Sequence, residues 1–188
     1  MEKYHLDCAY AITKFKHHNE IKSNLLDLIN LAKSQNVDDP GCETNISRAD
    51  WHDAQNFKRD WTTFLFPYLT NPVLEMYNSL GYDGYTLHDI WFQQYYKNSG
   101  HGWHTHSANF TNVYYLELPE STPKTKIVSP YNQKDVIEID VEEGDLLVFP
   151  SFTVHKGPPN ISTERKTIIS YNINATYSNN IYGQGINE

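Results

Sequence analysis

Histidines gather in one short part of this chain, residues 99–106. Three of the nine histidines, His101, His104 and His106, lie within six residues of one another there. An i, i+2 pair such as His104 and His106 can work in two ways: on a β-strand both imidazoles lie on the same face, and at a strand end the two can bind one ion as neighbouring ligands. Imidazole is the commonest side-chain metal ligand, and a further candidate, His155, follows an apolar run later in the chain. The spacing therefore predicts a metal site built from His104, His106 and His155.

The residue types leave more than one chemistry open for such a site. Three histidines with an open fourth position suit zinc hydrolysis. Against that, the sequence contains no H-E-x-x-H motif, and no second carboxylate ligand is obvious. A histidine cluster that only picks up metal adventitiously is a further alternative, since short motifs often arise by chance.

The composition narrows the class of protein. Acidic residues outnumber basic ones, 23 to 15, and no basic run is present, which argues against nucleic acid or an anionic membrane as the partner. The two cysteines, Cys8 and Cys42, are too few for a disulfide framework or a thiolate metal site. The first residues carry no apolar signal segment and nothing later resembles a membrane span, so the chain is expected in the cytoplasm.

The elements that must position the histidines divide the chain into two parts. Residues 1–81 are predicted to be mainly helical support, because apolar residues recur there at helical spacing. Within this part we expect a strand over 7–15, a helix over about 20–34, a loop over 36–45, a second helix that Pro67 ends or kinks, and a third that begins at Asn71-Pro72 and stops at Gly81.

After Tyr82 the pattern changes to short runs rich in β-branched and aromatic residues, separated by turn residues. The predicted strands are 85–92, 111–118, 125–128, 136–139, 145–149 and 166–173. Short strands without intervening helices are typical of a sandwich or barrel. The sequence therefore predicts an α+β protein with one domain, 1–188, in which a jelly-roll core over 82–176 follows the helices and residues 177–188 form a tail.

With these elements in place, the chain resembles the 2-oxoglutarate- and iron(II)-dependent oxygenases, whose core is a double-stranded β-helix. The resemblance covers about residues 85–174 and rests on three motifs in order. The run 104–106 is H-T-H, where the family has H-x-D or, in a short microbial branch, H-x-H. The run 113–116 is V-Y-Y-L, and the run 144–150, G-D-L-L-V-F-P, is followed by His155 and then Arg165.

The resemblance implies roles for the histidines. His104 and His155 correspond to iron ligands, and His106 stands where the family usually has a carboxylate. This departure replaces a 2-His-1-carboxylate set with three imidazoles if His106 binds. Three neutral ligands leave the full +2 charge of iron, whereas a carboxylate lowers it to +1.

The resemblance also implies residues that bind 2-oxoglutarate. Arg165 corresponds to the arginine that forms a bidentate ion pair with the distal carboxylate, for which a guanidinium is well shaped. Thr167 stands where the family has a serine that helps to hold this group. Of Tyr115 and Tyr114, one is expected to donate a hydrogen bond to it and the other to pack within the sheet.

The predicted function is thus a dioxygenase that uses Fe(II), 2-oxoglutarate and O₂ to hydroxylate a peptide side chain or a small molecule, releasing succinate and CO₂. Its pocket is expected to be lined by the aromatic residues Tyr95, Tyr96, Trp103 and Phe152. Two alternatives remain at this stage: a three-histidine dioxygenase of cupin type without 2-oxoglutarate, and a non-catalytic jelly roll that holds a metal and binds a ligand. The substrate and the oligomeric state do not follow from the sequence.

Overall fold

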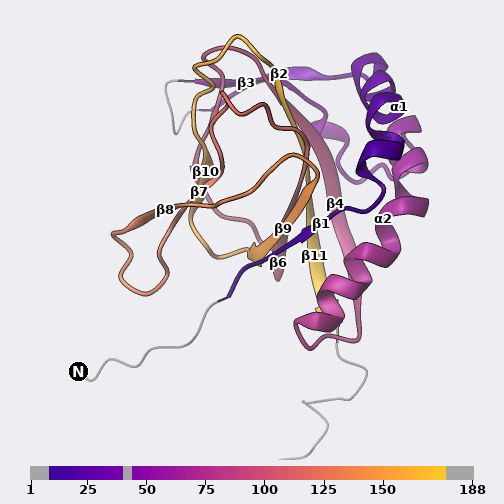
Figure 1. Cartoon of the computed structure of the whole chain (residues 1–188), viewed down its shortest axis with the longest axis vertical. Coiled ribbons are helices and arrows are strands. Elements are labelled where there is room, and N and C mark those ends of the chain that lie inside the picture. The colour runs from indigo at the N-terminus through magenta and orange to yellow at the C-terminus, as the bar shows by residue number, and fades with distance from the viewer. Residues whose placement is uncertain (1–8, 40–43, 177–188) are drawn as a thin grey trace, which may run out of the picture.

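The computed structural model describes residues 9–39 and 44–176, and Figure 1 shows two helices lying against a layered β structure. The predicted tail, 177–188, lies outside the described residues. The elements in chain order are β1 (Ala11–Lys14), α1 (His18–Leu31), β2 (Gln35–Asp38), β3 (Asn45–Ala49), the 3₁₀ turn η1 (Trp51–Asp53), α2 (Asp60–Ser79), β4 (Gly84–Tyr95), β5 (His101–His104), β6 (Phe110–Glu117), β7 (Lys126–Val128), β8 (Val136–Glu138), β9 (Asp145–Pro150), β10 (His155–Gly157) and β11 (Lys166–Thr176).

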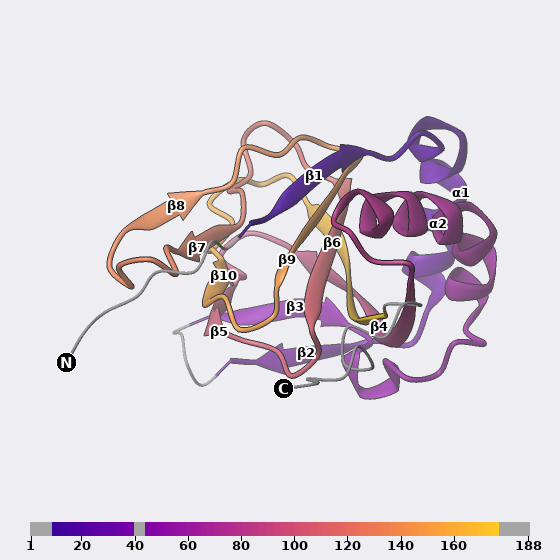
Figure 2. The same ribbon diagram turned by 90° about the horizontal axis from the view of Figure 1, so that it is seen from below.

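The strands form two antiparallel sheets. The larger sheet has seven strands in the order β1-β9-β6-β11-β4-β3-β2, and the smaller has four in the order β5-β10-β7-β8. In Figure 2 the smaller sheet lies to one side of the larger, and the helices lie on the opposite side. This arrangement confirms the predicted α+β class and its jelly-roll core. Within the described residues, no helix is long and apolar enough to cross a membrane.

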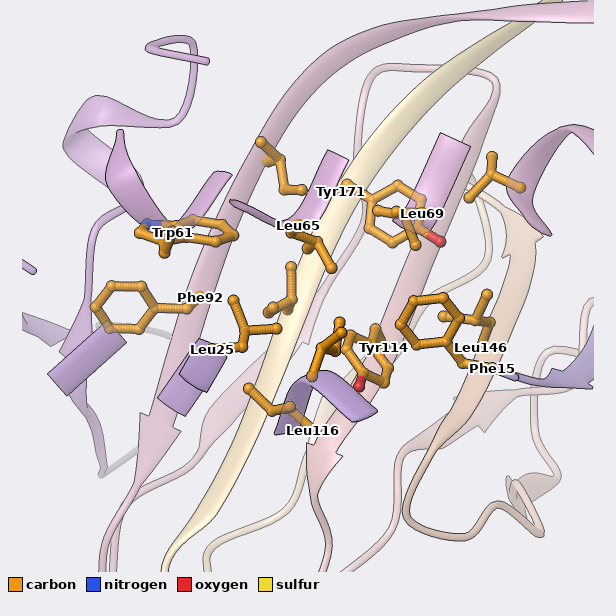
Figure 3. Packing of buried hydrophobic residues seen from close by; sticks show 14 of the residues in the cluster. Phe15, Leu25, Trp61, Leu65, Leu69, Phe92, Tyr114, Leu116, Leu146 and Tyr171 are labelled. Atoms are coloured by element: carbon orange, nitrogen blue, oxygen red, sulfur yellow. The ribbon is translucent and has the colours of Figure 1, made fainter. Parts of the chain in front are cut away.

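Two apolar cores lie on the two faces of the larger sheet. One joins this sheet to the helices and includes Leu25 of α1, Leu65 of α2 and Tyr114 of β6 (Figure 3). The other lies between the sheets and includes Tyr115 and Phe149. Because side chains alternate along a strand, neighbours such as Tyr114 and Tyr115 serve different cores.

Helix α2 runs through both Pro67 and Pro72, so it does not end at Pro67, and the predicted new helix start at Asn71-Pro72 is wrong. Pro67 lies on the exposed side of the helix, where water can satisfy the carbonyl that loses its partner. On the inner side, Trp61, Leu65 and Leu69 are buried at four-residue spacing and continue to Val73. This continuous buried stripe outweighs the local preference of proline to end a helix.

Four short strands were not predicted. The expected loop over 36–45 contains the end of β2 and the start of β3, and β5 and β10 contain the histidines themselves. These strands are polar or glycine-containing, and they are held by pairing with neighbours distant in sequence. Strand propensity and alternation therefore give little sign of them.

Candidate metal centre

The pairing of β5 with β10 brings the predicted histidines together. His104 lies directly opposite His155 in the ladder. His106 follows β5, and its backbone N–H donates to the carbonyl of Ser151 at 3.0 Å. One candidate ligand atom from each of the three histidines lies within 4.8 Å of the others. His104 and His155 are 51 residues apart in the sequence, yet together with His106 they form one cluster that can hold a metal ion.

Two of these imidazoles are oriented by backbone carbonyls. His104 Nδ1 lies 2.7 Å from the carbonyl oxygen of Gly102, and His155 Nδ1 lies 2.9 Å from that of Thr153. A carbonyl oxygen only accepts hydrogen bonds, so each Nδ1 carries the proton. Each Nε2 is left with a free lone pair, which is the state a metal requires.

The third imidazole, that of His106, contacts polar side chains and not a backbone carbonyl. The side-chain amide nitrogen of Asn172 donates to Asp89 Oδ1 at 2.8 Å and lies 3.5 Å from His106 Nδ1. Trp91 packs against the same imidazole, with ring centroids 5.7 Å apart. His106 is therefore fixed beside the other two histidines by residues of β4 and β11.

The histidines of the cluster are neutral at ordinary pH. Burial lowers the pKa of His104 and His155, and it lowers that of His106 to about 4. His101 stacks on His104, with ring centroids 3.7 Å apart, and faces Asp39 at 3.7 Å, outside the group of three. Three neutral imidazoles form a donor set that fits a divalent transition metal such as iron or zinc.

The metal cluster opens into a pocket between the two sheets. Its walls come from alternate residues of two paired strands, Trp91, Gln93 and Tyr95 of β4 and Lys166, Ile168 and Ser170 of β11. In the ladder, Lys166 lies opposite Tyr95, and Asn172, the partner of His106, lies opposite Asp89. The pocket thus has a lysine near one end of the β11 wall and the His106 contacts near the other.

Lys166 is a functional candidate that the sequence reasoning missed. It is 2% exposed, and its Nζ donates to the carbonyl of Pro123 at 2.7 Å. Its Nζ also lies 5.7 Å from the ring of Tyr95 and 5.9 Å from that of Tyr115. It forms no ion pair with any residue in the described part of the chain, and burial lowers its pKa to about 8. A buried cation without a counter-charge is costly unless an anion binds beside it.

The structure does not bring Arg165 into this pocket. Its guanidinium forms a bidentate ion pair with Glu117, at 2.8 and 2.9 Å, and donates to Asn30 at 2.9 Å. Thr167 donates to Glu117 as well and accepts from the side chain of Gln94. Alternation along β11 explains both positions, because Arg165 and Thr167 face away from the side that carries Lys166. Arg165 and Thr167 are therefore absent from the lining of the pocket, whereas Lys166 is part of it.

The two tyrosines separate as expected for neighbours on a strand. Tyr115 lies on the pocket side, where its hydroxyl donates to Thr125 Oγ1 at 2.7 Å, and Thr125 itself lines the pocket. The hydroxyl of Tyr114 lies 2.8 Å from His18 Nδ1, among the residues that join the sheet to α1. Of the two, only Tyr115 is near Lys166.

Among the four aromatic residues predicted to line the pocket, Tyr95 does so. Tyr96, Trp103 and Phe152 are exposed and are absent from its lining; Trp103 packs under Lys156 on the outer surface. Trp91 was not singled out from the sequence, yet it lines the pocket, and its indole nitrogen is buried without a hydrogen-bond partner. Trp91 lies two residues before Gln93 and four before Tyr95, so side-chain alternation along the predicted strand could have identified it as a pocket residue.

Comparisons with known proteins are informative at the level of structure. No protein-family model matches the sequence, and neither does any curated protein. Among solved structures, an oxidoreductase of the 2OG-Fe(II) oxygenase family from Burkholderia pseudomallei is 13% identical, with a TM-score of 0.66 over 89% of this chain and 87% of that one. AviO1 from Streptomyces viridochromogenes is 13% identical, with a TM-score of 0.64 over 88% and 90%. The collagen prolyl hydroxylase of Paramecium bursaria Chlorella virus-1, solved with 2OG, is 16% identical, with a TM-score of 0.56 over 89% and 96%.

These identities are low, so the similarity concerns the fold. The resemblance drawn from the sequence motifs is confirmed at that level: this chain has the fold of the 2-oxoglutarate- and iron(II)-dependent oxygenase structures, with a cluster of three histidines that can hold a metal.

Proposed function

We propose that this protein is an Fe(II)- and 2-oxoglutarate-dependent oxygenase that hydroxylates a peptide side chain or a small molecule. The observation that carries the proposal is the presence of Lys166 and the three histidines in one pocket. A neutral-imidazole cluster suits a metal, and a buried lysine without an ion pair suits an anionic ligand. Neither a simple metal-holding module nor a cupin dioxygenase without a dianionic cosubstrate requires that lysine.

Several residues of the chain have roles in this proposal. His104, His106 and His155 hold the iron. Lys166 binds the distal carboxylate of 2-oxoglutarate, and its own hydrogen bond to the carbonyl of Pro123 fixes the ammonium in place. Tyr115 lies beside that ammonium, with its ring centroid 5.9 Å from Nζ, and is a candidate for a phenol contact.

Iron and 2-oxoglutarate together supply the oxidising power, with succinate and CO₂ as products and one oxygen atom of O₂ going to the substrate. The walls of the pocket restrict water around the reacting groups. Trp91, Gln93 and Tyr95 form one such wall, and all three are almost completely buried. The indole N–H of Trp91 has no hydrogen-bond partner within the part of the chain that the structure describes, which leaves it available to a bound molecule.

The test compares two neighbouring basic residues. Under anaerobic conditions with Fe(II), 2-oxoglutarate is titrated into wild type, Lys166→Met and Arg165→Met, and binding is followed by the visible absorption of the complex and by calorimetry. Loss of a charge-assisted contact costs roughly 2–5 kcal/mol. Lys166→Met is therefore expected to weaken 2-oxoglutarate binding by well over tenfold, whereas Arg165→Met should bind it as wild type does.

Two results would contradict the proposal or part of it. A wild type that binds Fe(II) but has no affinity for 2-oxoglutarate would refute the oxygenase function and favour the two alternatives without this cosubstrate. If only Arg165→Met lost affinity for 2-oxoglutarate, the distal carboxylate would bind to Arg165, as the family motif suggested, and not to Lys166. Succinate formation with a panel of peptides and amino acids then identifies the substrate.

A further inference from the structure

A second cavity, of about 250 Å³, lies on the other side of the larger sheet from the histidines. Helix α2 forms one wall, with Leu69 and Val73, and the strands β4 and β11 form the other, with Leu87 and Ile173. Thr70 at its rim is exposed, so the cavity reaches the surface. Among the described residues, no charged side chain lines it.

One buried polar group in this cavity has no partner. Tyr171 lines the cavity and is 1% exposed, and its hydroxyl makes no hydrogen bond to any residue in the described ranges, 9–39 and 44–176. Figure 3 shows this side chain extending from β11 next to Leu69 of α2. Burial raises its pKa well above the ordinary value, so the phenol keeps its proton and remains a hydrogen-bond donor.

The other polar groups of the lining are already engaged. The hydroxyl of Tyr85 donates to the carbonyl of Thr70 at 3.2 Å, and Thr70 Oγ1 donates to the carbonyl of Phe66 at 2.8 Å. The hydroxyls of Tyr85 and Thr70 can still accept a hydrogen bond, but their protons are already donated, so Tyr171 is the one free donor among the described lining residues. The phenol is costly to leave unbonded, and the partner that it lacks is an acceptor.

We propose that this cavity binds a small neutral molecule that is largely apolar and has one oxygen atom, such as a ketone, that accepts a hydrogen bond from the Tyr171 hydroxyl. The apolar walls provide most of the contact, and the single donor fixes the orientation. A carboxylate or an ammonium is excluded, because no opposite charge lines the cavity to compensate its burial. The site is separate from the metal pocket and does not rest on the proposed oxygenase activity.

The test uses two probes of matched shape, cyclohexanone and methylenecyclohexane, of which only the first carries an oxygen acceptor. The full-length protein is labelled on its Leu, Val and Ile methyl groups, and each probe is titrated while NMR spectra are recorded. Cyclohexanone is expected to shift the resonances of Leu69, Val73, Leu87 and Ile173 in a saturable way. Methylenecyclohexane should bind about tenfold more weakly, a typical effect of one buried hydrogen bond.

Two variants complete the design. Tyr171→Phe removes only the unpartnered hydroxyl, so it should fold as wild type does and should bind both probes equally, with cyclohexanone weakened about tenfold. Val73→Phe fills the cavity and should block both probes, which checks that the signals arise from this site.

Three outcomes would overturn the proposal. The first is that neither probe shifts these methyl groups. The second is that Tyr171→Phe binds cyclohexanone as well as wild type does. The third is a set of nuclear Overhauser contacts from residues 177–188 to the Val73 and Leu87 methyl groups, which would assign the cavity to the chain's own C-terminal segment.

Discussion

The replacement of a carboxylate by His106 changes the charge at the proposed metal rather than its number of ligands. Asp89 and Asn172 lie behind His106, so the carboxylate of Asp89 would act on the metal only through two intervening groups. If the three imidazoles hold iron, the dianionic cosubstrate must supply all of the negative charge around it.

A pair of substitutions at His106 tests this arrangement. His106→Ala should lower the affinity for divalent metal, because it removes one of three ligands. His106→Asp should retain the metal, because a carboxylate is an acceptable ligand for iron, but should shift the visible band of the iron–2-oxoglutarate complex through the lower net charge. Metal titration and absorption spectra measure both effects, with His155→Ala as the control that abolishes the site. An affinity and a band that stay the same in both His106 variants would show that His106 is not a ligand.

Lys166 predicts a pH dependence for the binding of 2-oxoglutarate. Burial lowers its pKa to about 8, so in the empty pocket the ammonium loses its proton as the pH rises through that value. Affinity for the dianion should be constant below about pH 7 and should fall by close to tenfold for each further pH unit above 8. Calorimetry from pH 6.5 to 9.5 measures this, and Lys166→Arg, which keeps its charge, should remove the decline. A wild-type affinity that is flat up to pH 9.5 would contradict it.

At the residue scale, the histidines could be predicted and the lysine could not. His104 ends β5 and His106 follows it two residues later, so their short spacing keeps the two imidazoles close together at the strand end. The choice between Arg165 and Lys166 depends on which face of β11 turns inward, and a one-residue error reverses that choice. The pairing of β11 with β6 also shifts register between Thr167 and Ile168, a local irregularity that the sequence does not reveal.

The elements place the ligands through one tight contact between strands. A Cβ atom at Gly100, just before β5, would lie 2.9 Å from the backbone nitrogen of Pro159 and 3.0 Å from the carbonyl oxygen of Gly157, at the end of β10. Both neighbours are backbone atoms, so they cannot move aside as a side chain can. The spacing between β5, which carries His104, and β10, which carries His155, therefore depends on a glycine at this position.

Gly100→Ala should accordingly weaken metal binding although Gly100 is not a ligand. We expect a loss of about 10–100-fold in metal affinity, the range found when groups that support metal ligands are changed. Gly84→Ala is the matched control, because its Cβ would meet only a side-chain oxygen of Thr176, away from the metal pocket. Metal titration and circular dichroism of both variants measure affinity and folding. Equal affinities would show that the strand spacing tolerates the extra methyl group.

Apolar strands could be predicted from the sequence, and polar strands could not. Long apolar strands such as β6, β9 and β11 bury most of their side chains, and their composition alone identified them. The polar strands β5 and β10 pair with each other, and β10 also pairs with β7; such long-range pairing leaves little local signal in the sequence. The strands that carry the proposed chemistry were thus the hardest to predict.

At the scale of the whole molecule, the larger sheet separates two environments with different requirements. Its helix side is an apolar core closed by α1 and α2, and its other side carries a second apolar core and one wall of the pocket that contains the histidines and Lys166. The chain has a net charge of −8, so the long-range field does not favour an anionic ligand. The local charge of Lys166 therefore has to attract the anionic ligand. Burying this lysine lowers the stability of the folded protein.

That cost is measurable in the stability of the folded protein. The pKa of Lys166 is about 8 in the folded chain and has its ordinary value of 10.5 when unfolded. Between these pH values the unfolded chain binds a proton that the folded chain does not, so the free energy of unfolding rises with pH in this window. The full contribution is on the order of 3 kcal/mol, of which part should appear in urea unfolding between pH 7.5 and 9.5.

Lys166→Met should remove this increase of the unfolding free energy with pH, and it should be more stable than wild type at pH 7. Lys97→Met, a substitution at an exposed lysine, should retain the increase. If all three proteins have the same pH dependence, the charge of Lys166 is already compensated in the empty pocket, and an anionic ligand is not needed to explain its burial.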